Sequence, residues 1–346
     1  RALTIEEKAL GRERPEVANT LNSLAVVYVL TRDYTHASEF AEAALAIDEK
    51  VLGPEHPDVA VILSVLGMVY QRKGDYSRAE QAYQRSLAIR EKLYGPRHPA
   101  IVTVLSNLWT FYDAKGDIPQ AIRSATRAAD IDEHNLELIL NTGSEEQKRL
   151  YVSTLSFQAG TNALISLHFH SAPNNPDAAR LALTTILRRK GRVLDVMSDQ
   201  MGALRRRLNA QDQVLLDQLG SIRSQLASLV LKGPGNSDPA KHQAAIAKLE
   251  SEAQGLEAEV SARSSEFRAQ SQTVTLERVQ HAIPANAVLV ELTLCAPIDI
   301  KSSSISPARY VAYLLRREGE PSWVDLGEAS AIDSDVAKFR DALREA

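Results

Sequence analysis

Apolar residues recur at spacings of three and four from the N-terminus to about residue 283, which is the period of an amphipathic helix. Residues 57–72 show the pattern, with one stripe formed by Val59, Leu63, Leu66 and Tyr70. After Pro284 the pattern changes to short continuous apolar runs at 287–294, 310–315 and 322–326, which predict strands. A last amphipathic stretch from residue 331 predicts a helix. The pattern therefore predicts a mainly α-helical chain that ends in a small sheet.

The first part of the chain repeats itself every 42 residues, as the glycines Gly11, Gly53 and Gly95 show. The same interval separates Pro15, Pro57 and Pro99, and also Tyr28, Tyr70 and Tyr112. Each copy predicts two helices, with a proline at the start of the first, and the second and third copies have a Lys-Gly-Asp turn between them at 73–75 and 115–117. A fixed period of this size indicates stacked repeats, so we predict an α-solenoid of about three copies over residues 1–134.

This repeat resembles the tetratricopeptide repeat, whose order of residues falls on Leu63, Leu66-Gly67, Tyr70, Ala79 and Tyr83. The usual period is about 34 residues, and the longer period with its Gly-Pro-x-His-Pro loop is similar to that of kinesin light chains and many bacterial proteins. The resemblance implies a groove, lined by the first helices, for a protein or peptide partner. The implied groove residues are Asn22, Val26, Ser64, Met68, Arg72, Ser106, Thr110 and Asp113. The alternative is that these side chains are merely solvated or are covered by the rest of the chain.

Residues 135–283 predict a helical linker whose segments are separated by clusters of turn-forming residues. Helices are expected from Ser144 to about His170 and from Asp177 to about Leu208. Two further stretches, 212–231 and 239–267, carry apolar residues at coiled-coil spacing. They predict an antiparallel hairpin over residues 212–267.

Residues 284–346 predict three strands and a helix, the beginning of an α/β domain that cannot close a core alone. Several stretches resemble tetratricopeptide proteins that end in a caspase-like CHAT domain: 138–147 (LILNTGSEEQ), 187–195, 287–291, 309–313, and 324–329 with 332–333. Members of that family cleave peptides with a His and Cys dyad on later strands, for which this chain offers no counterpart. The resemblance implies the regulatory, non-catalytic part of a CHAT-type cysteine peptidase, with its own C-terminal catalytic half as a further partner. The alternatives are a non-enzymatic adaptor and a cargo adaptor of the kinesin light chain kind.

Composition changes this picture little. The net charge of −4 and the pI near 6.1 do not favour nucleic acid or an anionic membrane as partner. Two basic clusters, 188–190 and 205–207, have no interleaved aromatic residues, so we interpret them as a solvated helix face or a contact between domains. A single cysteine favours a reducing, cytoplasmic setting, and neither a signal peptide nor a membrane-length apolar run is recognised.

No stretch of the sequence predicts catalysis, a cofactor or a metal. Cys295 follows an apolar run without a glycine-rich loop beside it, which is typical of a small apolar strand residue. His56 and His98 recur with the repeat, and we interpret them as loop histidines that bond a helix end. Residues 189–192 lack the strand and the leading glycine of a phosphate-binding loop.

Overall fold

The structure is a computed structural model. It describes residues 3, 6, 8, 9, 11–142, 157–197, 208–235, 237–264, 267, 274–299 and 304–345. These residues form two compact units. The first contains Arg1–Lys115, Arg123–Asn135 and Leu226–Lys248, and the second contains Gly116–Ile122, Leu136–Gln225 and Leu249–Ala346.

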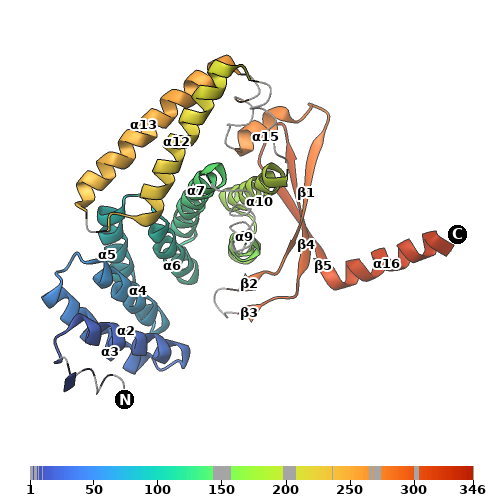
Figure 1. Ribbon diagram of the computed structural model, residues 1–346. Coiled ribbons are helices and arrows are strands. Elements are labelled where there is room, and N and C mark those ends of the chain that lie inside the picture. Colours follow the sequence, from blue (N-terminus) through green and yellow to red (C-terminus); the bar gives the residue numbers. More distant parts are fainter. Residues whose placement is uncertain are drawn as a thin grey trace. The chain divides into compact units, whose positions relative to one another are not determined.

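The first unit is a stack of helix pairs (Figure 1). The helices are α2 (Pro15–Leu30), α3 (Tyr34–Val51), α4 (Pro57–Arg72), α5 (Tyr76–Tyr94), α6 (Pro99–Lys115) and α7 (Ile118–Thr142), of which residues 123–135 belong to this unit. The first helix of each pair begins at one of the periodic prolines, and Asp33 and Asp75 cap the second helices α3 and α5 through their side chains. The predicted mainly helical fold with a repeat solenoid and a small C-terminal sheet is therefore confirmed.

Gly67 of α4 packs closely against Tyr83 of α5. A Cβ atom added to Gly67 would lie 2.6 Å from the Tyr83 ring, and this ring is itself only 2% exposed. In the next repeat the large side chain lies on the first helix and the small one on the second. Trp109 is equivalent to Gly67, Ala125 is equivalent to Tyr83, and both are buried. The stack therefore keeps its volume constant at this position by pairing a large side chain with a small one.

The turn inside each helix pair needs a residue with positive φ, and the three repeats fill it differently. Gly74 and Gly116 have φ of 79° and 84°, whereas the equivalent Arg32 has φ of 62°. A left-handed conformation costs a residue with a Cβ atom about 1–2 kcal/mol, and glycine avoids this cost. The first repeat therefore holds strain that the other two lack.

Helices α12 (Ala210–Lys232) and α13 (Pro239–Arg263) form the predicted antiparallel hairpin. The second helix ends at Arg263 and not at residue 267, because Ser264 leaves the helix and its hydroxyl accepts a bond from the Phe267 amide. Two ion pairs, Arg223 with Glu257 and Arg263 with Asp212, join the helices beside an apolar seam and fix their register. Residues 144–156 of the helix expected from Ser144 to about His170 lie outside the described residues, which resume at α9 (Phe157–Ser166).

The second unit holds a three-stranded antiparallel sheet in the order β1-β4-β5. The strands are β1 (Val288–Cys295), β4 (Arg309–Arg316) and β5 (Ser322–Glu328). The loop between the first two also contains a two-stranded ribbon of β2 (Ile298–Asp299) and β3 (Ser304–Ile305), which the sequence did not predict. The last helix, α16 (Ala329–Glu345), begins directly after β5, two residues earlier than predicted.

One face of this sheet packs on the helices that precede it. The core is formed by residues of α9, α10 (Pro176–Met197), α15 (Leu276–Ala282), the turn that follows α15, and the sheet: Ile165, Ala182, Leu183, Ile186, Leu276, Ile283, Cys295, Val311, Tyr313 and Leu315. His168, in the π-helical turn η1 (Leu167–Ser171), hydrogen-bonds the Tyr313 hydroxyl at 2.9 Å, and burial lowers its pKa to about 4. The sheet therefore obtains its covering layer from the helical middle of the chain.

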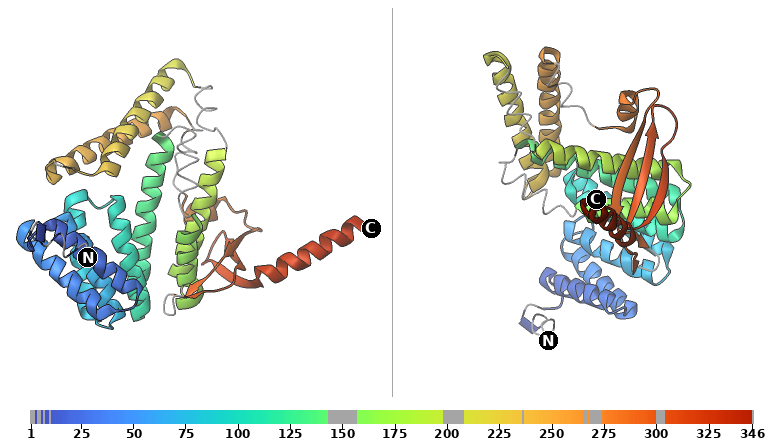
Figure 2. Two further views of the ribbon diagram at one scale, coloured as in Figure 1. Left: turned by 60° about the horizontal axis from the view of Figure 1, so that its bottom comes forward. Right: turned by 90° about the vertical axis from the view of Figure 1, so that its right-hand side faces the viewer.

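The opposite face of the sheet has apolar side chains exposed, Val290, Leu292 and Val324 among them, at 50%, 55% and 49%. Helix α16 runs away from the sheet and exposes a stripe with Val336 and Phe339 (Figure 2). Within the described residues, no helix is both long and apolar enough to cross a membrane.

We predict that Gly67→Ala destabilises the repeats. Alanine gains about 1 kcal/mol of helix propensity over glycine, but overpacking against the rigid, buried Tyr83 ring costs about 1–3 kcal/mol. The matched control is Gly220→Ala in α12, which has no atom within 4 Å of the new Cβ and should stabilise the chain. Urea unfolding measures both variants, and an equal stabilisation by both would contradict the close contact.

Candidate functional site: the surface of the first helices

Charge is distributed unevenly between the two helices of each repeat. The first helices are almost uncharged: α2 carries only Glu16, α4 only Asp58 and Arg72, and α6 only Asp113 and Lys115. The second helices α3, α5 and α7 are rich in Glu, Asp, Lys and Arg. The first helices therefore offer an uncharged, mostly apolar surface, and the second helices face water.

The charges of the second helices are used inside the stack, at the same 42-residue interval. Arg85 pairs with Glu49, and the equivalent Arg127 pairs with Glu91. The pairs Lys50–Glu13 and Lys92–Glu55 repeat in the same way. Each exposed pair contributes at most about 1 kcal/mol, so their main effect is to align one repeat on the next.

Buried tyrosines at equivalent positions of the first helices add a second link to the preceding repeat. The Tyr70 hydroxyl donates to Glu42 at 2.9 Å, and the Tyr112 hydroxyl donates to Glu80 at 3.0 Å. Both bonds reach the second helix of the preceding repeat. The first helices are thereby held on one side, and the opposite side stays available.

The predicted groove residues differ in exposure and in hydrogen bonding. Val26 of α2 and Met68 of α4 are half-buried, and Arg72 of α4 is exposed. Ser64 bonds Ser86 at 2.8 Å, so its hydroxyl belongs to the packing between α4 and α5.

The remaining groove residues lie on α2 and α6. Asn22 and Ser106 are half-buried. Thr110 donates to backbone carbonyls of its own helix. Asp113 is only 1% exposed, so its carboxylate does not reach the surface.

Among the exposed apolar residues of the first helices, two that the sequence reasoning missed lie at helical spacing from the predicted groove residues. Leu30, at the end of α2, is 78% exposed, and Val61 of α4 is 43% exposed. Leu30 is the equivalent of Arg72 in the preceding repeat, so the 42-residue interval could have predicted that Leu30 lies on the same surface. We call the set Val26, Leu30, Val61, Met68, Arg72 and Thr110 the inner-helix surface.

The loop histidines have the predicted role. Nδ1 of His56 accepts from the Asp58 amide at 3.3 Å, and Nδ1 of His98 accepts from the Ala100 amide at 3.0 Å. Each therefore caps the start of a first helix. Burial lowers the pKa of His98 to about 4, which keeps the ring neutral and its Nδ1 lone pair free for this bond.

Asp48 of α3 is an unusual buried carboxylate. It is 0% exposed, and neither carboxylate oxygen has a hydrogen-bond partner within the described part of the chain. Burial raises its pKa to about 6, and the nearby Asp58 carboxylate adds to the rise. Its repeat equivalents are Arg90, which donates to the Ala100 carbonyl, and the exposed Asp132.

The side chain of Cys295 lies on the covered face of the sheet and is 0% exposed. Burial raises the pKa of this thiol to about 11, with the Asp325 carboxylate adding to the rise. A nucleophilic cysteine needs the opposite, a lowered pKa and access to substrate. The thiol therefore acts as a small apolar core residue.

The first basic cluster binds other parts of the second unit. Arg188 donates to the Val274 carbonyl at 3.1 Å, and Lys190 contacts Glu291 and the Leu292 carbonyl of β1. The second cluster, 205–207, lies outside the described residues. Among the residues that are described, no three His, Cys, Asp or Glu side chains could hold a metal ion.

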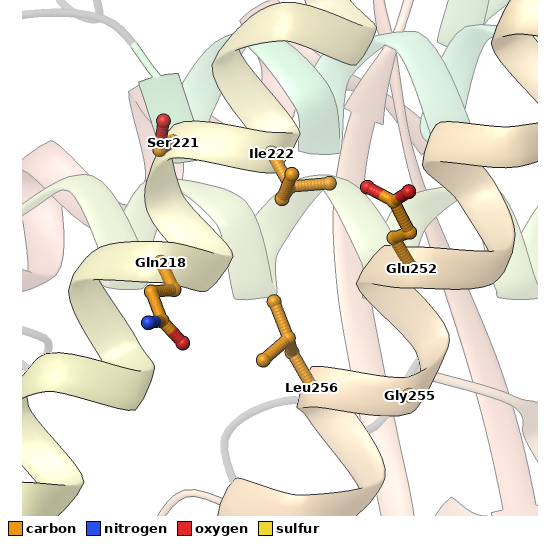
Figure 3. Close-up of a pocket in the computed structure, with 6 residues that line it drawn as sticks. All are labelled: Gln218, Ser221, Ile222, Glu252, Gly255 and Leu256. Carbon is orange, nitrogen blue, oxygen red and sulfur yellow. The ribbon is translucent and has the colours of Figure 1, made fainter.

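A shallow hollow of about 510 Å³ lies between α12 and α13 (Figure 3). Ile222 and Leu256 point into the space between the helices, and Gln218, Ser221, Glu252 and Gly255 complete its lining. Glu252 is its only charged side chain. The hollow lacks the convergent polar groups of a small-molecule site.

Comparison with known proteins identifies the repeats. A family model described as "Tetratricopeptide repeat" matches residues 1–50, 32–92 and 58–134. Residues 1–134 are tetratricopeptide repeats. Repeats of this kind indicate protein–protein interaction, and the rest of the chain lies outside the matches.

A comparison with solved structures finds a distant similarity. The crystal structure of BtubC (BKLC) from P. vanneervenii is 20% identical, with a TM-score of 0.37, over 57% of this chain and 67% of that one. No curated protein sequence matches the chain.

We predict that Asp48 makes the tetratricopeptide repeats less stable as the pH rises. The folded state raises its pKa from 3.8 to about 6, so the folded chain binds the proton more tightly than the unfolded chain does. The contribution of Asp48 is therefore greatest below the unfolded pKa and is lost as the pH rises through about 6. Asp48→Asn should raise the Tm at neutral pH, and the gain should shrink towards acid pH.

The control for this prediction is Asp132→Asn, at the equivalent but exposed position. The difference between its Tm and that of the wild type should not grow as the pH rises through about 6. A wild-type profile that Asp48→Asn leaves unchanged would show that the carboxylate is not destabilised in the folded state.

Proposed function

We propose that the chain is a protein-interaction and regulatory module that binds a partner segment on the inner-helix surface of its tetratricopeptide repeats. The observation that carries the proposal is the separation of charge between the helices. Charged side chains of the second helices form ion pairs with neighbouring repeats. The first helices instead leave apolar side chains such as Leu30 and Met68 exposed or half-exposed.

We further propose, from the resemblance to CHAT-domain proteins, that this module belongs to a cysteine peptidase and is not itself catalytic. Two observations support this. The thiol of Cys295 is buried and has a raised pKa, so it cannot serve as the nucleophile. The sheet has an uncovered apolar face, and an α/β domain buries both faces of its sheet. A catalytic half is the layer that we propose for that face.

Partner binding is tested by selecting displayed random peptides of roughly a dozen residues, which span about 40 Å when extended. The wild-type chain should enrich peptides, and Met68→Glu should lose the enrichment because a carboxylate replaces an apolar contact. The matched control is Val51→Glu, an exposed valine at the end of α3. Equal enrichment by all three chains would place binding elsewhere, and no enrichment by the wild type would overturn the proposal.

The non-catalytic character has a separate test. The chain should leave unfolded casein intact during long incubation, because the thiol of Cys295 is closed off from substrate. The variant Cys295→Ala serves as the control for contaminating proteases. Cleavage that this substitution abolishes would contradict the assignment.

A further inference from the structure

We propose that the tip of the hairpin formed by α12 and α13 is a pH-sensitive latch on the repeats. The latch is closed while His98 and His242 are neutral, and it opens when these rings gain protons. The inference goes beyond the proposed function, because it concerns how the hairpin is held and not which partner the repeats bind. It is carried by the contact between the tip and the loop that joins α5 to α6.

The tip of the hairpin belongs to the same compact unit as the repeats. Residues Leu226–Lys248 group with Arg1–Lys115 (Figure 1). The side-chain amide of Gln243 donates to the Lys92 carbonyl at 2.8 Å and so satisfies one of the last carbonyls of α5. The end of this helix is therefore capped by a residue that lies 151 positions later in the chain.

The tip approaches the loop so closely that little room is left for a side chain. Gly233 has φ of 69°, and a Cβ atom added there would lie 3.2 Å from the Tyr94 ring and 3.4 Å from Nε2 of His98. Gly235 also has positive φ, at 54°, but no atom lies within 4 Å of a Cβ atom added there. The two glycines therefore separate the need for backbone freedom from the need for space at the contact.

Two histidine rings are part of this contact. His98 stacks on Tyr94 with ring centroids 4.6 Å apart, and its Nδ1 accepts from the Ala100 amide, so the neutral ring carries its proton on Nε2. His242 of α13 is 6% exposed, and its Nε2 has no hydrogen-bond partner within the described residues. Burial lowers the pKa of His98 to about 4, and repulsion from His242 and Arg90 adds to the lowering. The closed contact therefore favours neutral rings.

The acidic groups near the rings already have partners. Glu91 of α5 pairs with Arg127, and Asp238 caps α13 by accepting from two backbone amides. The first turns of α6 and α13, both fully described, contain no acidic residue. The basic groups at the contact are Arg90, Arg97 and Lys241. A proton on either ring therefore adds a positive charge beside other cations, which favours the open state.

Acid favours the open latch. The closed latch holds the pKa of His98 below its ordinary value of 6.5, so the open state binds the proton more tightly. The stabilisation of the closed state is present above pH 6.5 and is lost as the pH falls from there through about 4. Through His98 alone, the ratio of open to closed latch should rise about 30-fold between pH 7.5 and pH 5.

Spin labels on the two sides of the contact measure the opening. They are attached to cysteines that replace Gln81 of α5 and Ala245 of α13, both exposed, in a chain that also carries Cys295→Ala. Double electron–electron resonance gives the distribution of distances between the labels at each pH. The labelled chain should show one narrow distribution at neutral pH and a second population in acid, while circular dichroism shows that the helices are retained.

Histidine variants show whether these rings are the sensors. The double variant His98→Asn/His242→Gln should stay closed at both pH values, because asparagine can keep the helix cap and neither replacement takes up a proton. The matched control is His56→Asn, which replaces the equivalent cap of α4 and should open in acid as the parent chain does.

The two glycines test the close approach. Gly233→Ala should raise the ratio of open to closed latch at neutral pH by at least about fivefold, because its methyl group is overpacked against the Tyr94 ring. Gly235→Ala has a similar backbone cost without this contact, so its latch should stay closed. Equal opening by both variants would contradict the close approach.

The remaining outcomes decide the inference. A distance distribution that is the same at both pH values, or acid opening that the double histidine variant keeps, would overturn it. Loss of the helical signal in acid would overturn it too, because the chain would then unfold as a whole. The proposed function is tested separately by the peptide selection, and it stands or falls independently of the latch.

Discussion

Each helix pair of the repeat array must bury its apolar face on the next pair, and the other properties of the array depend on this stacking. A single pair cannot form a core, so the 42-residue interval fixes which side chains meet. Side-chain volume is closely matched where the helices of a pair meet. Gly67 faces Tyr83 in one repeat, and the equivalent residues in the next are Trp109 and Ala125. The polar links repeat with the same interval, from Arg85–Glu49 to Arg127–Glu91.

Stacking also explains where binding can occur. The second helices carry the charges that align the repeats, and those charges are occupied. The first helices are held from one side by bonds such as Tyr70 to Glu42, and they leave Leu30 and Val61 exposed on the other side. The surface available to a partner is therefore a result of how the stack is assembled. Its apolar character follows from which residues the stack does not use.

Much of the fold could be predicted from the sequence because its signals are local or periodic. The repeats follow from the interval, the capping role of His56 and His98 follows from their place before the helix starts, and the hairpin follows from its heptad spacing. The covering of the sheet could not be predicted, because the bond of His168 to Tyr313 joins residues 145 positions apart. The burial of Asp48 and Asp113 was missed for a similar reason. A carboxylate in a helix predicts an exposed face, and only packing between neighbouring elements shows otherwise.

The central claim is that a partner binds the first helices and not the second. Hydrogen–deuterium exchange of the chain, with and without the strongest peptide from the selection, tests it most directly. Binding to the first helices should slow exchange in residues 15–30 and 57–72 when the peptide is bound, with little change in 34–51 and 76–94. Protection confined to the second helices, or to the sheet between residues 288 and 328, would contradict it.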